Sequence, residues 1–281
     1  MRLGIFSRTF AGSDPATVLS AAAQAGFTAA QYNMVCSGLA AMPDAIGADV
    51  APRVARAARQ TGVEIVAVSG TYNMIHPDRK ARAAGHARLE TLARACAGLG
   101  TALITLCTGT RDAQDPWRGH PDNGTPQAWR DLLESMEKAI AIAEAYGLHL
   151  GIEPELANVV HSAPRARALI DQLGSARLRI VLDPANLFER ATPQEQRSTV
   201  AAAIDLLADR IAMGHAKDRH GDGSFATAGT GVLDYPHYLS RLKAVGFDGA
   251  LITHGLCAAE APGVATYLKR VLGEAGIRVQ A

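Results

Sequence analysis

The chain lacks an excess of charge of either sign. Lys and Arg together number 28 and Asp and Glu 27, which leaves a formal net charge of +1 and a pI near 7.8. A domain that grips nucleic acid electrostatically usually has a pI above about 9 and clustered Lys and Arg side chains. The sequence contains no such cluster, so its charge balance argues against a nucleic-acid partner.

Cysteines are scarce, and long apolar runs are missing. The four cysteines are scattered and form neither a CxxC pair nor a zinc-ligand spacing: Cys36, Cys96, Cys107 and Cys257. We expect reduced, mostly buried thiols in a cytoplasmic protein. No run of about 18 apolar residues occurs, so no transmembrane helix and no membrane partner are expected. The apolar N-terminal stretch is too short for a signal peptide and is interrupted by Ser7 and Arg8.

The sequence does contain an alternation that occurs eight times. A short apolar, β-branched run is followed by a polar loop and then by a longer segment with helical periodicity. The expected strands are 3–7, 27–33, 63–70, 102–109, 148–155, 178–186, 210–218 and 249–256. The expected helices are 14–26, 50–62, 78–99, 126–146, 164–173, 193–209, 235–245 and 262–273. Eight even repeats predict an α/β fold, a single (β/α)8 TIM barrel forming one domain over residues 1–281, in preference to a doubly wound sheet.

The longest irregular stretch covers residues 109–129 and follows the fourth expected strand. A long loop in a compact domain is usually functional or disordered. This one contains Trp117, His120 and Trp129, which favours a lid over the barrel mouth.

Polar side chains follow the expected strands, and a TIM barrel places its active site at the carboxyl ends of its strands. In the first half of the chain, this rule selects Ser7, Arg8, Gln31, Asn33, Ser69, Tyr72, His76, Thr108 and Arg111. In the second half, four consecutive strands each end in a potential metal ligand: Glu153, Asp183, His215 and His254.

Each of these four residues has an ordinary structural interpretation when it is taken alone. Either carboxylate could pair with Lys217 or Arg219, and His215 could be a hydrogen-bonded core histidine. Together, however, two carboxylates on neighbouring strands would repel each other, and burying them unpaired is costly. A divalent cation shared by two carboxylates and two imidazoles removes both problems. Such mixed ligands suit Mn²⁺, Co²⁺, Fe²⁺ or Zn²⁺ better than Ca²⁺.

Side-chain alternation suggests two further functional residues. Residues two apart in a strand face the same way, so Glu155 would share a face with Glu153, and Lys217 with His215. Glu155 is then a candidate acid or base, and Lys217 a candidate electrophile or binder of substrate oxygen. A salt bridge at the barrel rim is the alternative for both.

The motifs "GIEPE" (151–155), "VLDPANL" (181–187), "GHAKD" (214–218) and "GTG" (229–231) occur in order, and the first three each fall on one strand. Through these motifs the chain resembles the xylose isomerase-like TIM barrels of the sugar phosphate isomerase/epimerase superfamily. The resemblance covers essentially the whole chain. The resemblance implies a divalent metal, with Mn²⁺ expected first and Mg²⁺, Co²⁺, Fe²⁺ or Zn²⁺ as alternatives. It would be bound by Glu153, Asp183, His215 and a fourth ligand. Members often form dimers or tetramers, so a homo-oligomer is also implied.

The chain departs from the family pattern at two positions. His254 stands where the epimerases carry a second metal-bound glutamate, so their symmetric two-carboxylate mechanism cannot be assumed. Asn186 stands where some members carry a histidine, which counts against the members that cut DNA at abasic sites and need three zinc ions.

The expected function is therefore a divalent-metal-dependent isomerase or epimerase acting on a sugar, keto-sugar or cyclitol. It would abstract a proton next to a metal-bound carbonyl. The resemblance makes Glu153 the first candidate base, with Glu155 and His254 as the others. A metal-dependent lyase or dehydratase on a keto-sugar or oxidised glycoside is the alternative, and a binding protein that retains the barrel is a further one. The expected substrate-binding residues are His76, Trp117, His120, Asn186 and Arg219.

Overall fold

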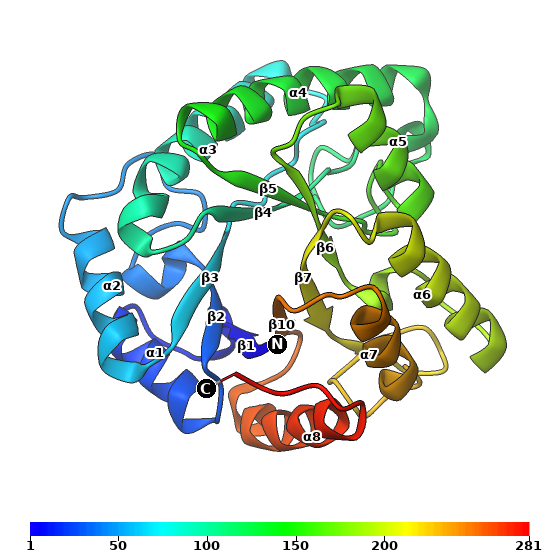
Figure 1. Ribbon diagram of the computed structural model, residues 1–281. Coiled ribbons are helices and arrows are strands. Elements are labelled where there is room, and N and C mark those ends of the chain that lie inside the picture. Colours follow the sequence, from blue (N-terminus) through cyan, green and yellow to red (C-terminus); the bar gives the residue numbers. More distant parts are fainter. Residues whose placement is uncertain (281) are drawn as a thin grey trace.

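Eight parallel strands close into a barrel in the computed structural model, which describes residues 1–280 (Figure 1). The order around the barrel is β1-β10-β7-β6-β5-β4-β3-β2, and β2 pairs with β1 to close it. The strands are β1 (Arg2–Phe6), β2 (Ala29–Tyr32), β3 (Glu64–Ser69), β4 (Leu103–Cys107), β5 (His149–Glu153), β6 (Leu178–Leu182), β7 (Ile211–Ala216) and β10 (Ala250–Thr253). The predicted (β/α)8 TIM barrel is confirmed.

The helices form a ring outside the barrel (Figure 1). They are α1 (Pro15–Gln24), α2 (Val50–Thr61), α3 (Arg79–Leu99), α4 (Pro126–Ala145), α5 (Ala163–Leu173), α6 (Pro193–Leu207), α7 (Tyr235–Ala244) and α8 (Ala261–Glu274). Their starts follow local chemistry. Asp14 accepts a hydrogen bond from the Thr17 amide, and Thr192 forms a capping box with Glu195. Among residues 1–280, no helix has both the length and the apolar character needed to cross a bilayer.

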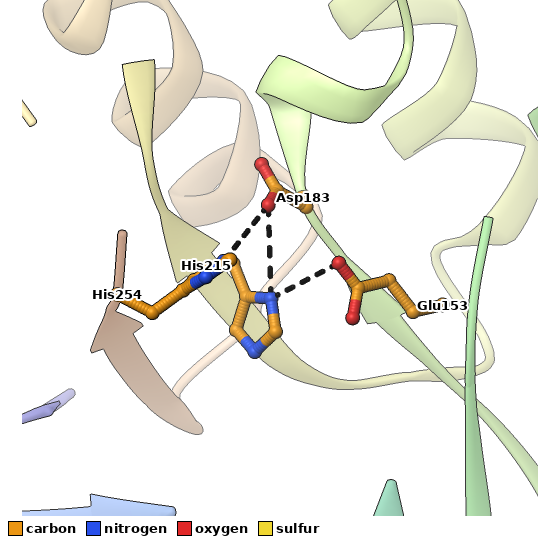
Figure 2. A group of neighbouring side chains, drawn as sticks. All are labelled: Glu153, Asp183, His215 and His254. Atoms are coloured by element: carbon orange, nitrogen blue, oxygen red, sulfur yellow. Dashed lines mark hydrogen bonds and ion pairs between the residues drawn. The ribbon is translucent and has the colours of Figure 1, made fainter. Parts of the chain in front are cut away.

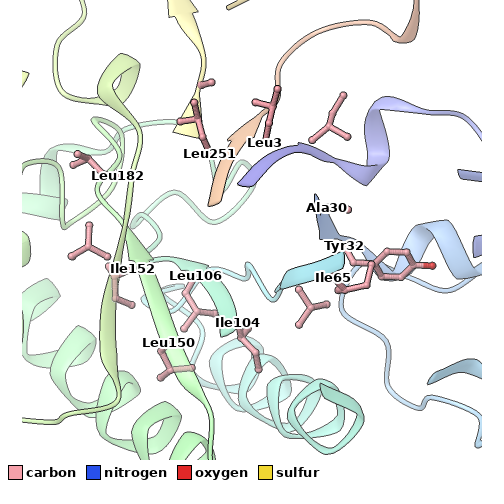
Figure 3. Close-up of a cluster of buried hydrophobic side chains, with 14 of the residues drawn as sticks. Leu3, Ala30, Tyr32, Ile65, Ile104, Leu106, Leu150, Ile152, Leu182 and Leu251 are labelled. Atoms are coloured by element: carbon pink, nitrogen blue, oxygen red, sulfur yellow. The ribbon is translucent and has the colours of Figure 1, made fainter. Parts of the chain in front are cut away.

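The apolar core has two layers because successive strand residues point to opposite faces of the sheet. Outward-facing residues such as Leu3, Ile104, Leu150 and Leu251 pack between strands and helices (Figure 3). A smaller cluster fills the barrel interior: Ala29, Ala67, Val181, Met213, Ala250 and Ile252. Gly4 completes this inner layer. A Cβ there would lie 2.4 Å from Cδ1 of Ile252 and 2.7 Å from the Ala29 carbonyl oxygen, so a larger residue would force the barrel apart.

The seventh strand is shorter than predicted, and a hairpin follows it. β7 ends at Ala216, and Asp218–Arg219 (β8) pairs antiparallel with Phe225–Ala226 (β9). The Asp218 carboxylate accepts hydrogen bonds from the backbone amides of Arg219, Gly229, Gly231 and Leu233. These bonds turn the chain out of the barrel and hold the hairpin over its mouth.

The predicted lid is held by asparagine side chains. Asn73 donates to the carbonyl oxygens of Thr110 and Asp112, and Asn123 accepts from the Arg111 amide and donates to the Ala157 carbonyl oxygen. The segment contains a short 3-10 helix, η3 (Pro121–Gly124), before α4 begins at Pro126. Trp129 belongs to α4, where its indole N–H donates to Gln172, so the structure removes it from the lid.

Candidate active site

The four predicted ligand side chains converge at the carboxyl end of the barrel (Figure 2). Glu153 is the last residue of β5, Asp183 directly follows β6, His215 lies in β7, and His254 directly follows β10. Because these strands are consecutive in the barrel, one potential ligand atom from each residue lies within 4.8 Å of all the others. These four residues are called the ligand cluster below.

The distances within the ligand cluster show how its carboxylates are balanced. Nε2 of His254 is 3.0 Å from Oδ2 of Asp183, and Nδ1 of His215 is 3.3 Å from Oε1 of Glu153 and 3.8 Å from Oδ2 of Asp183. Burial raises the pKa of Asp183, but the neighbouring His215 and His254 rings outweigh it and hold that pKa well below its usual range. Burial likewise raises the pKa of Glu153, and the neighbouring His215 lowers it further than burial raises it.

Gln31 sets the orientation of the His215 ring. Nε2 of His215 is 2.9 Å from Oε1 of Gln31, and the Gln31 amide N–H donates to the Thr105 hydroxyl at 3.1 Å. This arrangement assigns a proton to Nε2 and turns Nδ1 toward the two carboxylates. Nδ1 is buried and has no well-aligned hydrogen-bond partner among residues 1–280.

The donor set fits a divalent cation. Burial lowers the pKa of His215, but the Glu153 and Asp183 carboxylates raise it to about 9. Without a cation, a proton on Nδ1 therefore balances these carboxylates, and a cation would displace it. Burial and the charge of His215 lower the pKa of His254, which favours the neutral ring that binds metals.

Asn186 connects the ligand cluster to Lys217. Its side-chain N–H donates to Oε1 of Glu153 at 2.8 Å, and its Oδ1 accepts from Nζ of Lys217 at 3.4 Å. Asn186 lies in a 3-10 turn, η4 (Pro184–Asn186), that Asp183 caps by accepting from the Ala185 amide. One carboxylate oxygen of Asp183 thus shapes the turn while the other faces the cluster.

A cavity of about 650 Å³ opens above the ligand cluster. Glu155 and Lys217 both line it, although β5 and β7 end before these residues. Burial raises the pKa of Glu155 to about 7, with the Glu153 charge as the next cause. A carboxylate with that pKa suits proton transfer near neutral pH.

The structure brings only some of the predicted substrate-binding residues to this cavity. His76, Trp117 and Asn186 line it, and Trp117 is 57% exposed. His120 instead caps η3 by accepting from the Asp122 amide and does not line the cavity. Arg219 donates to the carbonyl oxygens of Ala185 and Gly223, so its guanidinium holds the loops and does not line the cavity either.

Two further residues line the cavity, and the sequence suggested no role for either. Phe225, on the β8–β9 hairpin, lines the cavity, and Nζ of Lys217 lies 3.2 Å from the centre of its ring. Arg8 follows β1 and also lines the cavity. Arg8 could be selected from its position after the first expected strand, but that position indicated no role. No sequence signal marked Phe225, because the hairpin strands are only two residues long.

Comparison with known proteins places the chain by its fold. No curated protein matches the sequence significantly. Solved structures that superpose over 98% of this chain include 3-keto-D-glucoside 4-epimerase YcjR from E. coli (17% identity, 99% of that chain, TM-score 0.75), L-ribulose 3-epimerase (19%, 94%, 0.77) and the IolI protein with a zinc atom bound (16%, 99%, 0.74). These likenesses show a shared barrel fold.

A family model gives the assignment. The model of the xylose isomerase-like TIM barrel matches residues 19–269, which include every strand except β1 and all four residues of the ligand cluster. The chain therefore belongs to the xylose isomerase-like TIM barrel family.

Proposed function

We propose that this protein is a divalent-metal-dependent isomerase or epimerase that acts on a sugar, keto-sugar or cyclitol. The observation that carries the proposal is the convergence of two carboxylates and two imidazoles beneath a cavity. Within this cluster, the buried Nδ1 of His215 has no well-aligned hydrogen-bond partner among the described residues. The epimerase names of two structural neighbours support the reaction class.

Glu153, Asp183, His215 and His254 would hold the cation. The zinc atom of the IolI neighbour supports a divalent ion, and Mn²⁺ is the ion we propose to test first. When bound, such an ion would polarise a substrate carbonyl and stabilise the negative charge that develops on its oxygen.

Glu155 is the side chain we assign to proton abstraction. It lines the cavity but is not part of the ligand cluster, whereas Oε1 of Glu153 is committed to Asn186 and His215. Lys217 lines the same cavity, with its ammonium over the ring of Phe225, and can donate to a substrate oxygen there. Glu155 can thus take a proton from carbon while Lys217 positions the substrate through one of its oxygens.

The test is exchange of carbon-bound hydrogen with solvent. Mn²⁺-loaded protein is incubated in D2O with a panel of ketoses, uronates, sugar phosphates and keto-glycosides and followed by NMR. Deuterium incorporation without loss of a leaving group supports the isomerase or epimerase. Release of water or of an aglycone shows the lyase alternative. The enzyme proposal fails if no panel member exchanges and the protein binds neither Mn²⁺ nor Zn²⁺.

A further inference from the structure

Lys217 carries a buried charge that lacks a carboxylate partner. Lys217 is only 8% exposed, yet its ammonium forms no ion pair within residues 1–280. Its ammonium makes one long hydrogen bond, 3.4 Å to Asn186, and lies over the Phe225 ring. Buried ammonium groups are normally paired because desolvating an unpaired charge is costly. The arrangement therefore points to a partner that comes from outside the chain.

Arg8 is a second cation at the same cavity. It follows β1, lines the cavity and forms no ion pair with any described residue. In the barrel, β10 lies between β1 and β7. The side chain of Lys217 runs beside Gly255, just past β10, with its Cε 3.9 Å from where a Cβ of Gly255 would be. Arg8 and Lys217 thus lie on either side of the exit of β10.

The charges that line the cavity leave an excess of positive charge in the loaded protein. A divalent cation would offset the carboxylates of Glu153 and Asp183. The cavity carboxylate of Asp112 is already paired with Arg118. Both ring nitrogens of His76 are engaged within the loops, Nδ1 with the Asp78 amide and Nε2 with the Ala113 carbonyl oxygen.

Arg8, Lys217 and Glu155 are the charged groups that remain at the cavity. Whether or not Glu155 is ionised, two cations face at most one anion. A neutral sugar would leave this excess of positive charge unbalanced, whereas an anionic group on the substrate would neutralise it.

We propose that the substrate is a sugar or cyclitol bearing an anionic group, a carboxylate or a phosphate, that binds between Arg8 and Lys217 above the exit of β10. The inference rests on the proposed function, since it names the substrate class of that site. A charge-assisted hydrogen bond from each cation would anchor the anionic end. The remainder of the molecule would lie over the ligand cluster.

The test is calorimetric binding of matched neutral and anionic probes to Mn²⁺-loaded protein. D-glucuronate and glucose 6-phosphate are compared with glucose, because the three share a ring. At least one anion should bind about tenfold or more tightly than glucose, with an affinity that falls as salt rises. The variants are Arg8→Gln and Lys217→Met, with Arg56→Gln as control because Arg56 is exposed on α2, away from the cavity residues.

The outcomes separate this inference from the proposed function. Each cavity variant should weaken anion binding about tenfold and leave Mn²⁺ affinity unchanged, and the control should alter neither. Preference for glucuronate identifies a carboxylate site, and preference for glucose 6-phosphate a phosphate site. Glucose binding as tightly as both anions overturns the inference, as does anion binding that survives both variants. In either case, solvent exchange on neutral ketoses would still support the proposed function.

Discussion

Nε2 of His215 lies 2.9 Å from Oε1 of Gln31, three strands away around the barrel. The Thr105 hydroxyl accepts from the amide N–H of Gln31 and so fixes which way that amide points. Groups that hydrogen-bond to the far nitrogen of a ligating histidine fix its ring and strengthen the ligand. Gln31 is thus a positioning residue for the Nδ1 atom that faces the carboxylates.

We expect Gln31→Met to weaken Mn²⁺ and Zn²⁺ binding about 10- to 100-fold, the usual effect of losing such a partner. Gln31→Glu keeps an acceptor at the same place and should restore affinity to within a few-fold. Competition with a chelator measures the dissociation constants. Nitrogen-15 NMR of the zinc-loaded protein should show the proton on Nε2 of His215. Equal affinities in wild type and Gln31→Met would refute this role.

Asp183→Ala should abolish tight metal binding, because Asp183 contacts both histidines of the ligand cluster. In the wild type, Mn²⁺ at 100 times its dissociation constant should add about 2.7 kcal/mol to the free energy of unfolding. The variant should show no gain, as measured by unfolding with and without Mn²⁺. Asp205→Ala, which removes a surface partner of Arg241, is the matched control and should keep the gain. Full metal retention in Asp183→Ala would contradict the ligand cluster.

Glu155→Gln should separate proton transfer from metal binding. The amide keeps the shape of the side chain but cannot accept the proton, so we expect solvent exchange to fall about 10²- to 10⁴-fold. Metal affinity should stay within a few-fold, since Glu155 is not part of the ligand cluster. NMR of samples quenched at increasing times measures the rate of solvent exchange, and competition with a chelator measures the metal affinity. Unchanged exchange would transfer the role of base to Glu153 or His254.

His254→Glu should change which metal the site prefers. The substitution replaces an imidazole by a carboxylate and makes the ligand set harder, so affinity for Mn²⁺ should rise relative to Zn²⁺. The measured quantity is the ratio of the two dissociation constants, which should shift about tenfold or more. His237→Glu changes a histidine on α7 whose ring bonds the backbone carbonyl oxygen of Arg197 and should leave the ratio unchanged. An unaltered ratio in His254→Glu would show that His254 is not a ligand.

The sequence predicted the barrel and the ligand cluster because both depend on local patterns. Apolar β-branched runs mark strands, and the barrel rule then places Glu153, Asp183, His215 and His254 at one end. Their meeting within 4.8 Å follows from the closed strand order.

Contacts between distant residues could not be predicted in this way. The bond from His215 to Gln31 spans 184 positions and depends on the barrel's closure. The expected strand 210–218 was too long at its carboxyl end. Nothing in an apolar run shows that the Asp218 carboxylate will accept hydrogen bonds from the backbone amides of a later loop. His120 and Arg219 do not line the cavity, because the His120 ring binds the Asp122 amide and the Arg219 guanidinium binds the carbonyl oxygens of Ala185 and Gly223.

Asp131 lies at the centre of a buried ion-pair network whose contribution to stability depends on pH. Its buried carboxylate lies 3.1 Å from Arg82 and 2.5 Å from Arg111, which also donate to the backbone carbonyls of His76 and Ile75. These bonds tie the β3–α3 loop, which lines the cavity, to the lid and to α4. Burial raises the pKa of Asp131, but the hydrogen bonds from Arg111 and Gln127 and the charge of Arg82 lower it overall.

A lowered native pKa means that ionised Asp131 stabilises the fold above its unfolded-state pKa of about 3.9, and that this stabilisation is lost as the pH falls through the native value. Asp131→Asn should cost about 3 kcal/mol at neutral pH, because two arginines lose their counter-charge. It should also flatten the acid side of the stability curve. Urea unfolding across the acid range measures both effects. Asp44→Asn, at an exposed ion pair, should cost less than about 1 kcal/mol, and an equal cost for the two variants would contradict the buried network.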